Sequence, residues 1–89
     1  MRKYSVEDNL SKRLKKLFRK DKVLYYVLMN KMDEILNVED VAHYKNLRSP
    51  LQDFKRVHVK SSFVLIFKYI PSEDRVIFFD LDHHDDIYS

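Results

Sequence analysis

Hydrophobic positions recur at helical spacing through residues 5–37 of the chain. The first apolar stripe contains Leu10, Leu14, Leu17 and Phe18. The pattern loses its phase at Asp21-Lys22, and a second stripe then contains Leu24, Leu28, Met32, Ile35 and Leu36. Ser5 and Asp8 are spaced as in a capping box, which favours a helix start near residue 5. The pattern predicts two antiparallel helices joined by a tight turn, an αα-hairpin.

The second half of the chain changes to strand-like patterns. Residues 54–60 alternate apolar and polar side chains, and residues 63–70 are almost continuously apolar. Residues 75–81 are rich in Val, Ile and Phe. Residues 61–62 and 71–74 have the composition of turns. Three consecutive strands joined by short turns are therefore predicted.

Two further segments complete the expected fold. Asn37 and Asp40 are candidate caps at the start of residues 38–52, and Arg48-Ser49-Pro50 is turn-forming, so this segment predicts a short helix or loop. Residues 1–6 can add a fourth strand at the edge of the sheet. Because helices come first and strands follow, the expected fold class is α+β.

The composition limits the function classes. The 89 residues, 1–89, suffice for one domain, and 45% of them are hydrophobic, which favours a folded core. The absence of cysteine excludes disulfide frameworks, thiolate zinc sites and cysteine nucleophiles. The absence of glycine excludes the Gly-rich loops that bind nucleotide phosphates. A small chain without disulfides is expected in the cytoplasm, and no apolar run is long enough to predict a membrane span.

The formal net charge of +3 hides an uneven distribution. Residues 1–22 and 45–60 are strongly basic, and residues 73–89 are acidic. This asymmetry indicates a polyanion or an acidic protein as partner. The alternative is a solvated helix face and a solubilising tail.

The residues with the clearest catalytic potential are four histidines, since imidazole exchanges protons near neutral pH. They are His43, His58, His83 and His84. Neighbouring antiparallel strands can bring His58 close to His83 or to His84. Strand alternation predicts that Arg56, His58 and Lys60 share one face, where the cations can stabilise a phosphoryl group as it acquires charge. The alternative is an ordinary polar face of a half-buried strand.

The segment Asp80–Asp86 combines imidazole and carboxylate groups and permits a metal site as an alternative. It contains the Asp-His-His letters of the DHH phosphoesterases, but that family needs further aspartate motifs on a much larger domain. No paired motif such as His-Glu-x-x-His is present. We therefore expect no bound metal and no other cofactor.

In their order along the chain, several segments resemble the RelE/ParE superfamily of toxins from bacterial and archaeal toxin–antitoxin operons. The resemblance is carried by Lys45-Asn46-Leu47 and by residues 54–60, 64–67 and 82–88. It implies a four-stranded, mostly antiparallel sheet with helices packed on one side. This agrees with the αα-hairpin and the strands predicted above.

A histidine three or four residues before a closing aromatic is typical of the RelE and YafQ-like branch. The resemblance then implies a metal-independent endoribonuclease that cuts mRNA in the ribosomal A site, leaving a 2′,3′-cyclic phosphate. The matching catalytic positions are His58, His84, His43, Tyr88 and Arg56. The cations expected to bind RNA are Lys45, Arg48, Lys55 and Lys60. The sequence departs from the family patterns at Ser62, where an aspartate is usual, and near Val64, where an arginine is usual.

The resemblance also implies a RelB-like antitoxin as partner, in a heterotetramer, and no association with membranes. An acidic antitoxin segment is expected to bind the basic helix through Lys12, Arg13, Lys16 and Arg19. Two alternatives stay open. One is a gyrase-inhibiting toxin of the ParE type, and the other is a non-catalytic module that binds RNA or an antitoxin.

Overall fold

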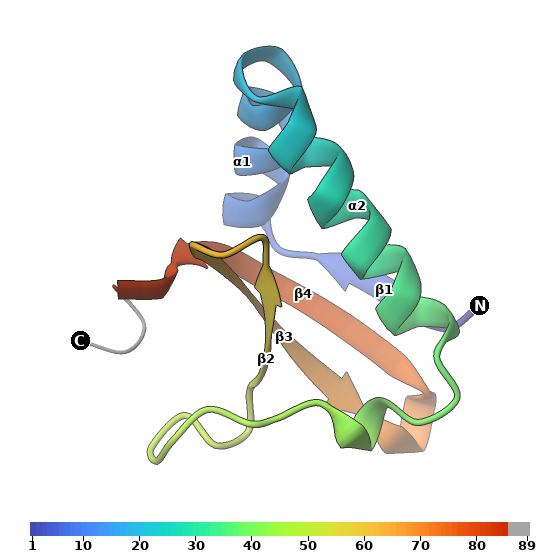
Figure 1. Ribbon diagram of the computed structural model, residues 1–89. Coiled ribbons are helices and arrows are strands. Elements are labelled where there is room, and N and C mark those ends of the chain that lie inside the picture. The colour runs from blue at the N-terminus through green and yellow to red at the C-terminus, as the bar shows by residue number, and fades with distance from the viewer. Residues whose placement is uncertain (86–89) are drawn as a thin grey trace.

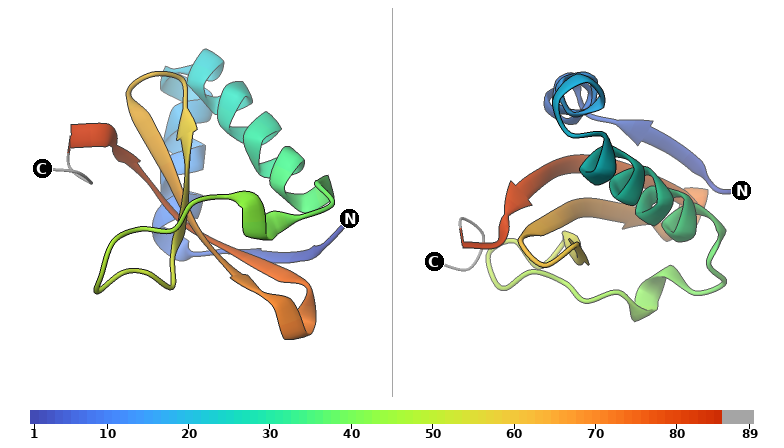
Figure 2. Two further views of the ribbon diagram at one scale, coloured as in Figure 1. Left: turned by 60° about the horizontal axis from the view of Figure 1, so that its bottom comes forward. Right: turned by 45° about the horizontal axis from the view of Figure 1, so that its top comes forward.

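Two helices pack against one face of a four-stranded sheet in the computed structural model, which describes residues 1–85 (Figures 1 and 2). The elements along the chain are β1 (Lys3–Val6), α1 (Asp8–Lys20), α2 (Lys22–Asn37), the 3-10 helix η1 (Val41–His43), β2 (Lys55–Val59), β3 (Phe63–Ile70), the 3-10 helix η2 (Pro71–Glu73) and β4 (Arg75–His83). The predicted α+β fold, with its αα-hairpin packed on the sheet, is confirmed.

The strand order in the sheet is β1-β4-β3-β2. β2, β3 and β4 form an antiparallel meander, and β1 joins the edge parallel to β4. The predicted fourth strand is therefore confirmed. β4 runs two residues past the predicted end at Leu81, because Asp82 and His83 continue the ladder with Val64 and Phe63.

The first helix begins later than the capping-box pattern predicts. Ser5 lies in β1 and pairs with Ile77, and α1 starts at Asp8 without a side-chain cap. The prediction is wrong because pairing with β4 recruits the backbone around Ser5 into the sheet. The predicted break between the helices is confirmed at Asp21, whose carboxylate accepts a hydrogen bond from the Leu24 amide at 3.1 Å.

The hydrophobic core lies between the helical hairpin and the sheet. Its fully buried members include Leu10, Leu28, Ile35, Phe67 and Phe78. Phe18 belongs to the predicted stripe of α1 but is 44% exposed, with its ring edge-on to Tyr25. No helix among residues 1–85 is long and apolar enough to cross a membrane.

Arg2 ties the start of the chain to two later segments. Its guanidinium donates to the carbonyls of Ile35, Leu36, Val38 and Glu39 at the end of α2. Its Nε also donates to the carboxylate of Asp74 at 2.9 Å, just before β4. These bonds satisfy helix-end carbonyls that have no partner within the helix.

The segment between η1 and β2 is the predicted loop, and it runs along the outer edge of the sheet. Asp40 caps η1 as predicted, accepting a hydrogen bond from the Ala42 amide at 3.0 Å. The Arg56 amide donates to the carbonyl of Lys45 at 2.9 Å, and Asn46 forms an isolated bridge with the strand. The loop thereby covers the first part of β2.

Candidate active site on the open face of the sheet

Strand β2 presents two chemically different faces. Val57 and Val59 pack against the core under the helices. Arg56 and His58 alternate with them and therefore project from the other face of the sheet. The packing of Val57 and Val59 on the core agrees with the predicted alternation. A basic group and an imidazole thus share the face that the helices leave open.

Lys60 does not continue this alternation. β2 ends at Val59, and Lys60 opens the turn to β3 with a φ of 55°. The strand argument for placing Lys60 on the face of His58 is therefore wrong, because a left-handed residue interrupts the alternation. Lys60 is exposed in the turn that follows β2, two residues after His58.

His84 lies next to His58. Their ring centroids are 5.3 Å apart, and the planes are inclined by 29°, so the imidazoles are stacked. The backbone amide of His84 donates to the carbonyl of Ser62 at 2.7 Å. The β2–β3 turn therefore holds His84 against β2, although β3 lies between β2 and β4 in the sheet. Of the two predicted neighbours of His58, the structure selects His84.

The end of β4 carries a second group of polar contacts. The Asp85 amide donates to Nδ1 of His83 at 3.3 Å. One carboxylate oxygen of Asp85 lies 3.8 Å from Nδ1 of His83, and the other lies 3.8 Å from Nδ1 of His84. The sequence predicts Asp85 only as one carboxylate of the alternative metal segment Asp80–Asp86, and it predicts no role for the Ser62 carbonyl. A carboxylate beside two histidines is a signal that could have identified Asp85, whereas a backbone carbonyl leaves none.

The remaining cations predicted to bind RNA differ in their surroundings. Nζ of Lys55 donates to the carbonyl of Tyr44 at 3.1 Å and to Oδ1 of Asn46 at 2.9 Å. Lys55 thus holds the loop against the strand, and its predicted role in binding RNA stays a prediction. Lys45 and Arg48 are exposed on the loop.

His43 is not brought to the His58–His84 pair. It lies in η1, where Nδ1 is 2.5 Å from the carbonyl of Asp40 and the ring packs on Tyr44 with centroids 4.0 Å apart. In Figures 1 and 2, η1 lies toward the end of β3 that leads into η2, whereas β4 finishes beside the β2–β3 turn. His43 therefore belongs to a separate cluster.

That cluster is built on a hydrogen bond from the Tyr44 hydroxyl to the carboxylate of Glu34, 2.5 Å long. The hydroxyl lowers the pKa of Glu34, and Lys31 lowers it further. Burial and the same hydrogen bond raise the pKa of Tyr44. The Tyr44 ring also packs edge-on to Phe67. The cluster joins α2 to the loop and the core.

Two predictions concern the C-terminal segment. Tyr88 lies outside the described residues, so its predicted catalytic role stays a prediction. Within residues 1–85, no group of three or more His, Asp or Glu side chains converges as a metal-binding cluster. The imidazoles of His58 and His84 are instead paired with each other, and His83 is on the other side of the strand.

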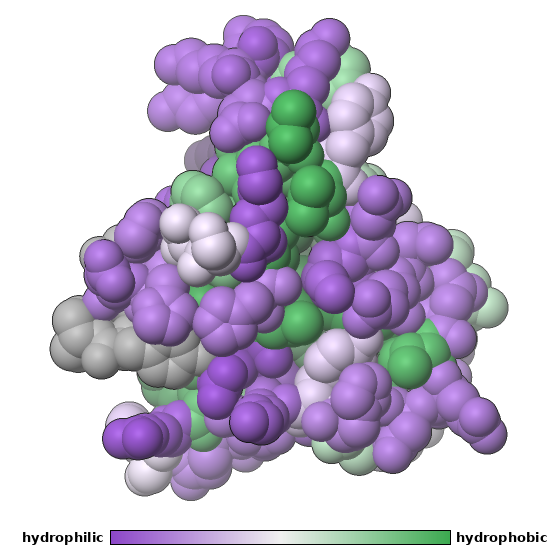
Figure 3. Space-filling model, viewed as in Figure 1, coloured by the Kyte–Doolittle hydropathy of each residue, from purple (hydrophilic) through white to green (hydrophobic). Residues whose placement is uncertain are grey.

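Hydrophobic side chains are exposed along the helical hairpin. They include Phe18, Val23, Tyr26 and Met29. Figure 3 shows a band of such side chains along α2, with hydrophilic side chains around it. A hollow of about 440 Å³ between the helices is lined by Leu14, Lys15, Phe18, Arg19 and Tyr25.

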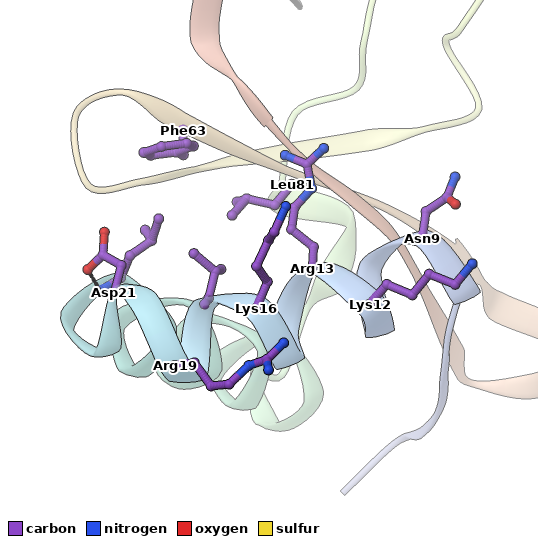
Figure 4. Close-up of a pocket in the computed structure, with 10 residues that line it drawn as sticks. Asn9, Lys12, Arg13, Lys16, Arg19, Asp21, Phe63 and Leu81 are labelled. Atoms are coloured by element: carbon purple, nitrogen blue, oxygen red, sulfur yellow. Dashed lines mark hydrogen bonds between the residues drawn. The ribbon is translucent and has the colours of Figure 1, made fainter.

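A basic groove lies between α1 and the sheet. It has a volume of about 670 Å³, and Leu17, Leu24, Phe63 and Leu81 form its apolar part. The four cations predicted to bind an antitoxin all line it: Lys12, Arg13, Lys16 and Arg19. Figure 4 shows Arg13 and Lys16 projecting from α1 toward the strands. Arg13 makes an ion pair with Asp80 of β4 at 3.6 Å.

No family model matches the chain. Among proteins of known sequence, "Putative toxin RelE4" of Methanocaldococcus jannaschii is 48% identical over 87 residues, which cover 96% of this chain and 90% of that protein.

Two solved structures share the fold. A metal-bound toxin from Helicobacter pylori superposes with a TM-score of 0.76 at 22% identity, over 98% of this chain and 99% of that chain. A chain of the E. coli RelBE toxin–antitoxin complex superposes with a TM-score of 0.71 at 17% identity, over 91% of this chain and 94% of that chain. The two solved structures show that the fold is shared, and the 48% identity to the M. jannaschii protein, over almost the whole length of both chains, shows that this chain belongs to the RelE family of toxins from toxin–antitoxin systems.

Proposed function

We propose that this toxin is a ribosome-dependent endoribonuclease that cuts mRNA in the ribosomal A site. The observation that carries the proposal is the stacked pair of imidazoles from His58 and His84, 5.3 Å apart. Two adjacent imidazoles supply a base and an acid within reach of one phosphodiester. Arg56 lies two residues before His58 on the same strand face and supplies a cation.

The chemistry follows from these groups. One imidazole removes the proton of the ribose 2′-hydroxyl, whose oxygen then attacks the adjacent phosphorus. The other imidazole donates a proton to the departing 5′-oxygen, and the P–O bond to that oxygen breaks. The guanidinium of Arg56 stabilises the extra negative charge of the phosphorane. The products are a 2′,3′-cyclic phosphate and a 5′-hydroxyl, and no step uses a metal.

The RNA path is proposed to run over the open sheet face and the turns around it. Lys45 and Arg48 are exposed on the loop before β2, Lys60 is exposed in the turn after it, and cations of this kind bind RNA phosphates in a salt-dependent way. Tyr88, if it follows His84 toward the same site, offers a ring on which a base can stack. His43, in its separate cluster, is proposed to act on RNA that extends past η1.

The proposed partner is a RelB-like antitoxin. Membership of the RelE family supports it, and the basic groove beside α1 suits an acidic segment that also carries apolar side chains. A heterotetramer of two toxins and two antitoxins is the proposed assembly. Since its substrate is mRNA on ribosomes, the toxin is proposed to act in the cytoplasm.

Cleavage by the purified toxin on ribosomes programmed with a defined mRNA tests the proposal. We expect cuts within the A-site codon, 2′,3′-cyclic phosphate ends, and equal rates with and without a chelator that removes zinc and manganese but leaves the Mg²⁺ of the ribosome in place. The variant H58A/H84A serves as the inactive control. Loss of cleavage in that chelator, with recovery on addition of zinc or manganese, would establish a metal mechanism instead. Inhibition of gyrase by a toxin that leaves mRNA intact would establish the ParE-type function.

A further inference from the structure

His83 lies on the other side of β4 from the stacked pair, and the mechanism proposed above does not use it. It pairs in register with Phe63 at the end of the β3–β4 ladder. The two rings pack edge-to-face with centroids 5.6 Å apart. Phe63 in turn packs against the hydrophobic core under the helices. The imidazole of His83 is therefore anchored on the helix side of the sheet.

The imidazole of His83 also makes a hydrogen bond to the backbone that follows it. Nδ1 of His83 accepts a hydrogen bond from the Asp85 amide at 3.3 Å. Because a backbone amide can only donate, Nδ1 carries no proton in this arrangement, and the neutral ring carries its proton on Nε2. An acceptor side chain that takes an amide two residues later, where a helical turn begins, acts as an N-cap. Residues 84–85 begin such a turn.

The captured turn is the one that carries His84. Its backbone is held on one side by the bond from the His84 amide to the Ser62 carbonyl, 2.7 Å long. On the other side it is held by the bond between Asp85 and His83. With both bonds in place, the imidazole of His84 stacks on His58. Removal of either bond frees the backbone on one side of His84.

We infer that His83 is a positioning residue, whose Nδ1 sets the turn that holds His84 over His58. The effect on cleavage rests on the proposed function, because it assumes that His84 transfers a proton. The effect on the His58–His84 contact does not rest on it. His83 thus acts through the chain that follows it and needs no contact with RNA.

Three substitutions separate the hydrogen-bond acceptor from the bulk of the ring. In H83N, the amide oxygen stands near the place of Nδ1 and can accept from Asp85. In H83Q, the oxygen stands near the place of Nε2, so the side chain is polar but its acceptor is misplaced. In H83L, packing on Phe63 is retained and no acceptor is left. H83N is therefore the matched control for the other two.

Ribosome-dependent cleavage of a defined mRNA provides the first measurement. We expect kcat to fall about 10- to 100-fold in H83Q and H83L with KM changed less than about twofold, since a displaced catalytic group slows the chemical step. H83N should stay within about threefold of the wild type. Equal kcat in all four proteins would overturn the inference.

Nuclear magnetic resonance of the purified toxin provides a second measurement that needs no activity. In the wild type and H83N we expect nuclear Overhauser contacts between the rings of His58 and His84, and these should weaken in H83Q and H83L. The nitrogen shifts of His83 in the wild type should show the proton on Nε2. Unchanged ring contacts in H83Q and H83L would overturn the inference, even if cleavage fell. A wild type that cuts no mRNA would overturn the proposed function alone, because the ring contacts would still decide the role of His83.

Discussion

The imidazole of His84 lies over that of His58, with centroids 5.3 Å apart and planes inclined by 29°. His58 lies in β2 and His84 directly follows β4, and these two strands are not neighbours because β3 separates them. The contact forms where the chain leaves β4 and crosses the start of β3, at the bond from the His84 amide to the Ser62 carbonyl. The geometry of the pair therefore depends on the turn between β2 and β3.

The stacked pair predicts strongly non-additive kinetics. Single H58A and H84A changes should each lower the cleavage rate by about 100- to 10,000-fold, the usual effect of removing a positioned acid or base. The double variant should be little slower than the slower single variant, since residues that act as a unit are not additive. Single-turnover rates on programmed ribosomes measure this. Losses that multiply in the double variant would show that the two histidines act independently.

Arg56 should affect binding and chemistry together. R56A should lower kcat and raise KM, because in the proposed mechanism the same guanidinium both binds the RNA phosphate and stabilises the charge that develops on it. R56K should recover binding better than rate, since an ammonium keeps the charge but loses the planar, two-pronged donor geometry. Titration of mRNA-programmed ribosomes separates the two constants. If saturating RNA restored the full rate of R56A, Arg56 would be a binding residue alone.

Replacing Lys60 with glycine should raise the stability of the fold and weaken RNA binding. Its φ of 55° is costly for a residue with a side chain, and K60G should raise the free energy of unfolding by up to about 1 kcal/mol. The same change removes an exposed cation and should weaken RNA binding. K60A is the matched control, because it removes the charge and keeps the backbone cost. Denaturant unfolding and RNA titration distinguish them, and equal stabilities for K60G and K60A would contradict the backbone explanation.

Glu34 should make the fold sensitive to acid. The Tyr44 hydroxyl lowers its pKa below the ordinary 4.5, so the folded state favours the ionised carboxylate. This stabilisation is complete above pH 4.5 and is lost as the pH falls through the lower pKa of the folded protein. E34Q should therefore lower the free energy of unfolding by about 0.5–1 kcal/mol at pH 7, a small effect because the carboxylate is partly exposed. The difference should become progressively smaller in acid. Denaturant unfolding at several pH values measures it; a gap that stays constant down to pH 2 would contradict the assignment.

The basic groove should accelerate association with an acidic antitoxin. K16E should lower the association rate constant about two- to tenfold at low salt, and the difference should shrink as salt rises. K3E is the control, because Lys3 is exposed in β1 and does not line the groove. Stopped-flow mixing of toxin and antitoxin measures both. Equal rate constants for K16E and K3E would indicate that the groove is not the docking site.

Much of the fold can be predicted because its signals are local. The helical stripes and the Asp21 break follow from spacing, and the period of two places Val57 and Val59 in the core. The start of α1 could not be predicted in the same way. The spacing of Ser5 and Asp8 fits a capping box, but parallel pairing with β4 places Ser5 in a strand. A partner more than half the chain away decided that conformation.

The candidate site divides along the same line. The face shared by Arg56 and His58 follows from strand alternation. The choice of His84 over His83 depends on a hydrogen bond to the backbone carbonyl of Ser62. Because every residue has a backbone carbonyl, the sequence does not mark this one. Charge alone could not distinguish Lys55 from its neighbours. Its ammonium binds the carbonyl of Tyr44 and the amide of Asn46, and those partners become adjacent only when the loop folds over β2.

The parallel pairing of β1 with β4 has a consequence for when the sheet can fold during synthesis. β1 is the first strand to leave the ribosome, and its partner is the last of the four. The sheet therefore stays open during most of translation, since a contact between distant segments cannot form before both exist. The same holds for the two stacked imidazoles, one of which follows β4. A nascent chain therefore cannot form the complete sheet, or the contact between His58 and His84, before β4 has been synthesised.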